Sequence, residues 1–523
     1  MKKILIGESD FKKIQKEKAY YIDKSLFIED MLNCPHKVML LPRPRRFGKT
    51  LNLSLLYHFF EKRDEDESYL FDNLAIKKSP LFQDYFGKYP VIFITFKDIK
   101  HVTWEACWND IKHIISQVYE THSYLLNSDY LSEQESLDYK NIIKKEANEV
   151  DYSNSLKMLS KHLNDYHQKD VIILTDEYDT PIHAGYQYGY YDEYAIPFMR
   201  NLLSGAYKDN SNLYRGVITG TLRISKESIF TGLNNLGVYT LLKKKFNTSF
   251  GFTEDEVKNI LEDFNLSEHY PIILKWYDGY KFGGKKVFNP WSVMNFISNN
   301  DEKPEPYWIN TSSLEMIEEI ITPNKQNLRE ELNDLIEGKV ITKTIHENMV
   351  FDDIKDSRSD LLWSFLLHSG YLKVVEEVET EYRRKFQLQI PNHEVEIIYM
   401  ELVEKWLKKH IDLKQLKSLL WSLKNGEITL FEKNLKAICL EIMSYHDFSG
   451  SPEKVYHALV LGMLVWLSND YVIRSNRESG YGRYDIIFKP KDITKQGIII
   501  EFKRIYEDED SEEVLDGALK QID

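Results

Sequence analysis

The chain has 523 residues, 42% hydrophobic and 29% charged, a composition ordinary for globular protein and long enough for roughly three domains of ~150 residues. Its formal net charge of -14 argues against a surface coated in basic charge for non-specific nucleic-acid binding, but leaves a local basic groove open. The three cysteines lie far apart and form no C-x-x-C pair, which argues against a disulfide scaffold or a zinc ribbon.

No apolar run predicts a membrane segment. The first residues contain no stretch long enough for a signal peptide. The longest apolar run, residues 455–467, is too short to span a bilayer and is typical of a buried helix. We therefore expect a soluble, cytoplasmic protein without membrane contact.

The first half of the chain alternates β-rich runs with longer helical patterns. Strands are predicted over residues 37–41, 90–96, 171–177 and 213–219. The stretch 51–62 is predicted to be helical, because its leucines and a phenylalanine recur at helical spacing. Such alternation predicts a parallel sheet with helices on both faces.

From about residue 250 the pattern changes. Thr253 followed by Glu256 predicts a capping box at a helix start, and Asn289 before Pro290 predicts another helix start. Residues 310–440 read as mostly helical. Strand-like runs return over 484–488 and 497–503.

The loop "RPRRFGKT", residues 43–50, ends as a phosphate-binding loop ends. The pattern G-x-x-x-x-G-K-[ST] has glycine where this chain has Arg43. Gly48, Lys49 and Thr50 supply the remaining elements between a predicted strand and a predicted helix. In such a loop the backbone N–H groups surround the phosphates, the lysine reaches their oxygens and the hydroxyl holds magnesium. A basic helix start without a ligand is the alternative.

Two further strand ends carry polar side chains suited to a nucleotide. Asp176 and Glu177 end the run "IILTDE", where one carboxylate would hold magnesium through water and the other would polarise the attacking water. Thr219 and Arg223, at and beyond the end of the next strand, would sense the γ-phosphate. The alternatives are two solvated acids and ordinary turn chemistry around Gly220.

Several stretches together resemble a known family. "LLPRPRRFGKTLNLSLL", "LTDEYDTPI", "TGTLRISKESIFTGLNNL", "FGFTEDEV" and "WYDGYKFGG…FNPWSV" resemble the AAA-ATPase-like domain of many bacterial proteins, which commonly carries a C-terminal PD-(D/E)XK nuclease domain. That family has an arginine-rich loop. The resemblance implies that Lys49 and Thr50 bind phosphate and magnesium, and that Asp176 and Glu177 are the magnesium-holding and catalytic acids.

The predicted nucleotide-binding set is larger than these four residues. The three loop arginines either hold phosphate through bidentate contacts, pack against acidic neighbours or meet a partner. The residues expected to bind ATP are Arg43, Pro44, Arg45, Arg46, Phe47, Gly48, Lys49, Thr50, Asp176, Thr219 and Arg223.

The C-terminal run "IIIEFKR" predicts a metal-dependent site. Side chains alternate along a strand, so Glu501 and Lys503 share a face. Adjacent antiparallel strands would bring Asp485 beside Glu501, where the two carboxylates would hold a cation and the lysine would stabilise developing charge. A face of cross-strand ion pairs is the alternative.

This segment resembles the PD-(D/E)XK nuclease superfamily, and the resemblance implies two further catalytic residues, Glu453 and Gln521. The expected metal is Mg²⁺, with Mn²⁺ as an alternative. Arg477 and Arg483 lie in a loop upstream of the metal-binding strand and suit contacts to backbone phosphates; solvated arginines on a flexible hairpin are the alternative. The chain stops soon after Gln521 and carries an acidic run at 506–513, which leaves nuclease activity open.

The expected fold class is α/β: a P-loop NTPase core of the AAA/ASCE type, a helical middle and a small restriction-endonuclease-like domain. The expected domains are 1–245 (ATPase-like), 246–310 (helical and lid-like), 311–430 (helical connector) and 431–523 (nuclease-like). The expected function is ATP hydrolysis coupled to cleavage of DNA rather than RNA, in defence or mobile-element biology. The alternative is a nucleotide-controlled interaction module with an inactive nuclease fold. A homo-oligomer is left open.

Overall fold

The computed structural model divides the chain into two compact units, Met1–Met316 with Thr342–Glu394 and Ile317–Ile341 with Val395–Asp523. Each unit is described by itself. The structure describes residues 3–208, 210–223, 235–299, 303–308, 331–332, 334–347, 359–378, 384–410, 412–444, 466–467, 470–479, 482–500 and 519.

A five-stranded parallel sheet forms the centre of the first unit. Its strands lie in the order β2-β3-β4-β1-β5. Four of them confirm the predicted strands, and the fifth is a three-residue strand too short to leave a pattern. The bounds are β1 Val38–Pro42, β2 Val91–Thr95, β3 Val171–Asp176, β4 Leu213–Gly220 and β5 Leu236–Val238.

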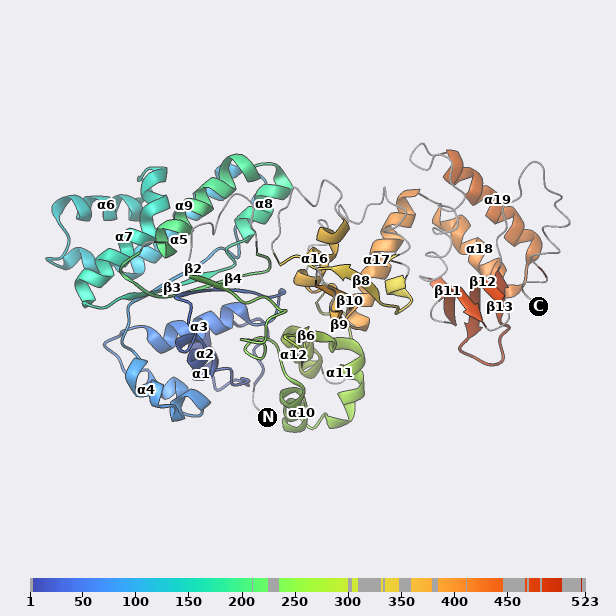
Figure 1. The fold of residues 1–523 in the computed structure, drawn as a ribbon, viewed down its shortest axis with the longest axis horizontal. Coiled ribbons are helices and arrows are strands. Elements are labelled where there is room, and N and C mark those ends of the chain that lie inside the picture. Colours follow the sequence, from blue (N-terminus) through green and yellow to red (C-terminus); the bar gives the residue numbers. More distant parts are fainter. Residues whose placement is uncertain are drawn as a thin grey trace. The chain divides into compact units, whose positions relative to one another are not determined.

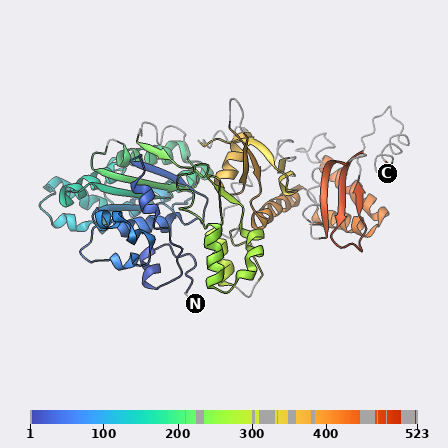
Figure 2. The same ribbon diagram turned by 60° about the horizontal axis from the view of Figure 1, so that its bottom comes forward.

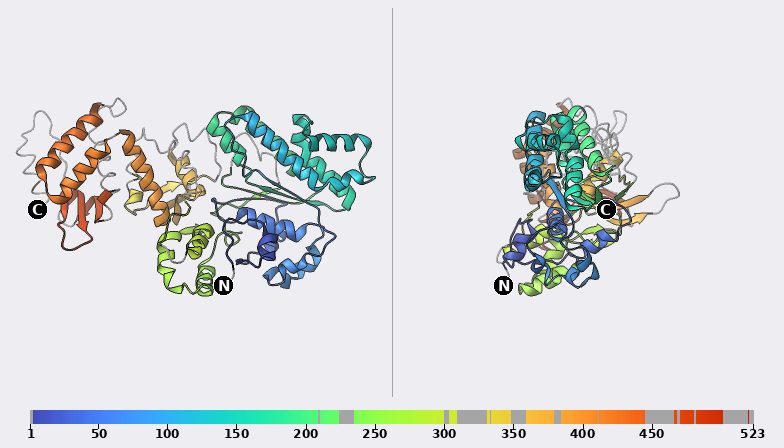
Figure 3. Two further views of the ribbon diagram at one scale, coloured as in Figure 1. Left: turned by 180° about the vertical axis from the view of Figure 1, so that it is seen from behind. Right: turned by 90° about the vertical axis from the view of Figure 1, so that its left-hand side faces the viewer.

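Helices cover both faces of this sheet (Figure 1). Helix α3 (Lys49–Phe60) packs on one face, and α5 (Trp104–Thr121), α7 (Glu149–His167) and α9 (Ile196–Tyr207) pack on the other. The view from behind shows the same two layers (Figure 3). The expected α/β architecture is therefore confirmed. The remaining helices here are α1 Phe11–Lys16, α2 Phe27–Leu32, α4 Pro80–Tyr85, α6 Glu133–Lys144 and α8 Thr180–Tyr188, with short 3₁₀ segments at Ser68–Phe71, Ala75–Lys78 and Ser123–Asn127 and a π-helical turn at Tyr191–Ala195.

A small helical subdomain follows the sheet. Its elements are α10 Glu254–Asp263, a 3₁₀ turn Ser267–His269, α11 Tyr270–Tyr277, the hairpin strands β6 Tyr280–Phe282 and β7 Lys285–Val287, and α12 Pro290–Ser298. Both predicted helix starts are confirmed: Thr253 and Glu256 form a capping box, and the Asn289 side chain accepts from two α12 backbone N–H groups.

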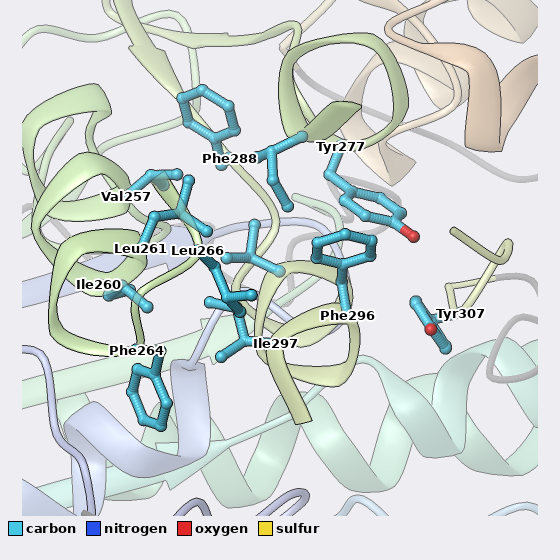
Figure 4. Close-up of a cluster of buried hydrophobic side chains, with 12 residues drawn as sticks. Val257, Ile260, Leu261, Phe264, Leu266, Tyr277, Phe288, Phe296, Ile297 and Tyr307 are labelled. Atoms are coloured by element: carbon cyan, nitrogen blue, oxygen red, sulfur yellow. The ribbon is translucent and has the colours of Figure 1, made fainter. Parts of the chain in front are cut away.

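This subdomain has its own apolar core, which is drawn in Figure 4. Val257 and Ile260 of α10 meet Phe296 and Ile297 of α12, and all four are almost fully buried. The three elements therefore fold as one body beside the sheet, held by burial of their facing apolar stripes.

The middle of the chain is mostly helical, as predicted, but it also contains an unpredicted sheet. The described helices are α16 Ser359–Ser369, α17 His393–His410, α18 Leu413–Asn425 and α19 Ile428–Ser444. The sheet has the order β8-β10-β9, formed by Ile341–Thr344, Lys385–Gln389 and Lys373–Val378. Its strands carry many charged and half-exposed residues, so no alternation of apolar residues marks them in the sequence.

The second unit ends in an antiparallel sheet, visible as the orange and red strands in Figure 2. It consists of β11 Tyr471–Ser479, β12 Gly482–Pro490 and β13 Ile498–Ile500. The strand predicted over 484–488 is confirmed within β12. The expectation that Arg477 and Arg483 lie in a loop was wrong, because the antiparallel ladder continues to Ser479 and Gly482. Among the residues described, no helix is both long and apolar enough to cross a membrane.

Candidate nucleotide site

The loop between β1 and α3 is built around two left-handed residues. Gly48 has φ 82° and Arg46 has φ 67°. Residues with a side chain rarely adopt this backbone conformation, so glycine at position 48 lets the chain turn into α3 without strain. As a result α3 begins at Lys49, and its first backbone N–H groups open toward the pocket beside the loop.

The Asp176 carboxylate joins three elements behind this loop. Asp176 is fully buried, and it accepts hydrogen bonds from the hydroxyls of Thr50 (2.8 Å), Thr95 (3.1 Å) and Thr219 (2.6 Å). Thr50 and Asp176, expected to share a metal ion, are thus in direct contact. Thr95 was missed by the sequence analysis, although it ends a buried strand whose carboxyl end meets that of β3.

Lys49 and Glu177 face each other across the loop. The Lys49 ammonium donates to the carbonyls of Arg43 and Pro44, both at 3.2 Å, and lies 3.9 Å from a Glu177 carboxylate oxygen. Glu177 has φ 49°, a left-handed turn directly after β3 that aims its side chain into the pocket. The Lys49 ammonium therefore binds two carbonyls of its own loop, and an anion in the pocket could replace them as acceptors.

The three loop arginines have different surroundings. Arg43 is fully buried, and its guanidinium donates to the carbonyls of Pro42 (2.8 Å), Tyr239 (2.7 Å) and Phe246 (3.0 Å). It also lies over the rings of Phe250 and Phe282. Burial lowers the pKa of Arg43 to about 9.

Neither Arg43 nor Pro44 lines the pocket. Their contact with ATP stays a prediction. The guanidinium of Arg43 supports the loop from inside, bound to main-chain carbonyls of three segments. Asp176, Thr219 and Arg223 also lie outside the pocket lining. Asp176 accepts hydrogen bonds from the hydroxyls of Thr219 and of Thr50, and Thr50 does line the pocket.

Arg45 and Arg46 do line the pocket. The Arg46 guanidinium lies 4.0 Å from the ring centroid of Trp291 in α12. Partial burial lowers the pKa of Arg46, and the neighbouring Glu177 opposes that shift. The backbone carbonyl of Arg45 accepts a hydrogen bond from the Trp308 indole at 3.3 Å. The stacking of Arg46 on Trp291 thus connects the loop to the helical subdomain.

The pocket has a volume of about 450 Å³, and its lining contains both basic and apolar residues. The basic residues are those of the loop together with Lys97 and Lys100. Burial and the nearby Arg45 lower the pKa of Lys100, as expected where positive groups crowd together. The apolar residues were missed by the sequence analysis: Ile6, Tyr20, Ile22, Phe252, Trp291 and Met294.

Those apolar residues come from the N-terminal segment and the helical subdomain, which lie far from the loop in sequence. No local motif marks them, because only folding brings the three segments together. The Lys24 side chain lines the pocket as well, but its ammonium is bound to Glu256 at 2.7 Å and to the carbonyl of Thr248 at 2.9 Å. The arrangement can hold a flat apolar group and an anionic group together.

The C-terminal site is only partly within the described residues. The β12–β13 ladder pairs Ile486 with Ile500 and Ile487 with Ile499. Asp485 lies in β12, directly before that ladder. Arg477 and Arg483 lie on paired strands, opposite Tyr484 and Glu478 respectively. Four expected catalytic residues lie outside the described part of the chain: Glu453, Glu501, Lys503 and Gln521. Within the described part, no group of three or more His, Cys, Asp and Glu side chains is placed to hold a metal.

Comparison with known proteins identifies a family for an N-terminal and a C-terminal segment of the chain. Residues 5–230 match the family model described as a predicted AAA-ATPase, and residues 451–523 match the PD-(D/E)XK nuclease superfamily. An uncharacterized protein in the vnfD 5' region of Azotobacter chroococcum mcd 1 is 23% identical over 395 residues, which cover 75% of this chain and 68% of the relative. The two family matches confirm the resemblances drawn from the loop and from the C-terminal strands.

Proposed function

The chain carries an AAA-ATPase-like domain and a PD-(D/E)XK nuclease superfamily domain, and from this premise we propose that it hydrolyses ATP and that its nucleotide state regulates metal-dependent cleavage of DNA. The nucleotide part of this proposal rests on the buried Asp176. Three hydroxyls from three separate elements converge on its carboxylate behind a basic loop.

The residues present fit a nucleoside triphosphate with magnesium. Thr50 and Asp176 offer the hard oxygen ligands that magnesium prefers, and Lys49 offers an ammonium now held by carbonyls. Magnesium, when bound, neutralises charge on the phosphate oxygens. Glu177 would accept a proton from the attacking water, since its carboxylate faces the pocket beside Lys49. The apolar residues of the pocket would take the base.

The nuclease part of the proposal rests on the family match and on the strand register. Asp485 stands one residue before the first β12–β13 pair and lies within the matched residues 451–523. There Asp485 and Glu501 would hold a divalent cation, and Lys503 would stabilise charge on the phosphate.

The test compares plasmid cleavage and ATP binding in wild type and four variants. Lys49→Ala is expected to weaken ATP binding at least about tenfold, equivalent to about 1.4 kcal/mol, and to remove the effect of ATP on cleavage. Asp485→Ala is expected to abolish cleavage while leaving ATP binding unchanged. The matched controls are Lys140→Ala, an exposed lysine of α6, and Asp492→Ala, an exposed acid in the turn after β12.

Two results would reject the proposal in separate ways. Equal cleavage by wild type and Asp485→Ala removes the nuclease assignment. Cleavage that responds to ATP in Lys49→Ala as it does in wild type removes the regulatory assignment. Binding of DNA without cleavage by the wild-type protein would favour the interaction-module alternative.

A further inference from the structure

The hairpin β6–β7 places like charges directly opposite each other. Its two strands pair Lys281 with Lys286, and a turn of two left-handed glycines, Gly283 (φ 51°) and Gly284 (φ 84°), joins them. Lys285 stands exposed beside that turn. Opposed cross-strand lysines disfavour a hairpin, so this pair needs partners elsewhere.

One face of the hairpin packs against the nucleotide loop, the loop of residues 43–50 between β1 and α3. Tyr280 and Phe282 are buried, and their ring centroids lie 5.0 and 5.2 Å from that of Phe47. Because side chains alternate along a strand, Lys281 and its partner Lys286 face the opposite way. The apolar face is therefore occupied within this unit. On the opposite face Lys281 is exposed and Lys286 is half-buried, and Lys285, paired with Phe282, is exposed at the turn.

Two other segments bring more positive charge to the same place. The Gly283 N–H donates to the carbonyl of Leu241 at 2.7 Å, and a Cβ at this glycine would lie 2.3 Å from the Lys243 carbonyl. Lys243 and Lys244 are thus held beside the hairpin tip. On the other side, the Lys281 ammonium donates to the Val375 carbonyl of β9 at 2.8 Å.

Arg384, directly before β10, completes the group. Burial and the nearby Lys281 and Lys286 lower the pKa of Lys373, while Asp278 opposes that shift. We name this group the basic hairpin surface; it comprises Lys243, Lys244, Lys281, Lys285, Lys286 and Arg384.

Acidic neighbours neutralise part of this surface and leave the rest. Glu347 lies 3.3 Å from Lys243 and 3.9 Å from Arg384, which also pairs with Glu377; Asp278 lies 2.7 Å from Lys286. Among the residues that the structure describes, no carboxylate pairs with the ammonium groups of Lys244, Lys281 or Lys285. These three carry uncompensated positive charge in a chain whose net charge is -14.

The chemistry of the surface favours a long polyanion. Its charges are ammonium groups on flexible stems, spread over two hairpins and a loop rather than gathered in a concave site. Such an array suits the repeated phosphates of a nucleic acid, whereas a single small anion needs converging donors. We propose that the basic hairpin surface binds the phosphodiester backbone of a nucleic acid. This inference rests on the proposed function in taking nucleic acid as the protein's substrate.

The test measures binding without cleavage. The full chain is titrated against a fluorescent 30-base-pair duplex in EDTA, and anisotropy is followed over a range of salt concentrations. The triple variant Lys244→Gln, Lys281→Gln, Lys285→Gln is expected to bind at least about tenfold more weakly at low salt, and its log–log salt slope is expected to fall by roughly 2 to 3, because each phosphate contact contributes about 0.9.

Two further variants keep the result interpretable. The control Lys140→Gln, Lys144→Gln, Lys157→Gln removes equal charge from exposed positions on α6 and α7 and is expected to bind like wild type. The triple Lys→Arg variant at 244, 281 and 285 keeps the charge and is expected to retain both affinity and slope. Loss of binding in the arginine variant would indicate a structural role and overturn the proposal.

The remaining outcomes separate this inference from the proposed function. Equal affinity and slope for wild type and the glutamine triple overturn the surface while leaving DNA cleavage untouched. A wild-type protein that binds no duplex overturns both. If the glutamine triple loses binding to phosphatidylserine vesicles but not to DNA, the surface serves a membrane and the proposal fails. Loss of DNA binding together with unchanged cleavage by Asp485→Ala leaves the surface standing and removes only the nuclease site.

Discussion

The nucleotide loop and the β6–β7 hairpin are both basic, and they meet at Phe47, yet they use positive charge in opposite ways. In the loop, Arg43 is directed inward, where its planar guanidinium reaches three carbonyls at once. In the hairpin, lysines such as Lys285 are directed outward, where a hydrated ammonium costs little to keep. A run of basic residues therefore does not by itself indicate a ligand site. The number of main-chain acceptors that folding brings to each side chain decides its role.

The largest expected effect comes from the inward arginine. Arg43→Met keeps much of the side-chain volume but leaves three buried carbonyls without a donor, and it should destabilise the protein by about 4 kcal/mol or more. Urea unfolding followed by tryptophan fluorescence measures the change. The matched control is Arg45→Met, which alters a pocket residue and should cost less than about 1 kcal/mol. Equal losses in the two variants would erase the distinction between inward and outward charge.

The loop's support also includes a buried acid. Glu394 accepts hydrogen bonds from the Trp308 backbone N–H (2.6 Å) and the Ser292 hydroxyl (2.9 Å), and the Trp308 indole in turn binds the loop carbonyl of Arg45. Burial raises the pKa of Glu394 to about 8 from an ordinary value near 4.5. The folded protein therefore keeps this proton between about pH 4.5 and 8, where the unfolded chain has lost it.

A raised carboxyl pKa makes stability fall as pH rises. The contribution of Glu394 is fully present below pH 4.5 and is lost as pH rises to about 8. Relative to wild type, Glu394→Gln should gain roughly 2 to 4 kcal/mol between pH 5 and pH 8, at about 1.4 kcal/mol per pKa unit. Urea unfolding of both proteins at the two pH values measures it. A stability difference that does not change with pH would show that Glu394 is ionised in the folded state.

The smallest expected effect lies on the hairpin. Lys285→Gln removes an exposed charge without a carboxylate partner among the described residues, so the free energy of unfolding should change by less than about 0.5 kcal/mol. The same unfolding measurement applies. A loss above about 1 kcal/mol would mean that this lysine supports the fold, and the hairpin would then resemble the loop rather than contrast with it.

Parts of the site were predictable because they are local. Gly48, Lys49 and Thr50 follow a buried strand and open a helix, and Asp176 ends a run of apolar residues, so periodicity and loop chemistry indicate both. Two of the three acceptors of Arg43, at Tyr239 and Phe246, lie about 200 residues away in sequence. No local sequence pattern indicates hydrogen bonds between residues so far apart.

The sequence by itself determined the alternation of four parallel strands with helices, the loop that opens α3 and the acids at the end of β3, because these depend on residues a few positions apart. The tertiary structure decided which side chains share a surface. It buried Arg43, stacked Arg46 on Trp291, added the N-terminal segment and the helical subdomain to the pocket, and gathered the basic residues of three segments beside one hairpin. Contacts of that kind form between chain segments that meet only when the apolar core is buried. The positions of the charged side chains are then set by the packing of the segments that carry them.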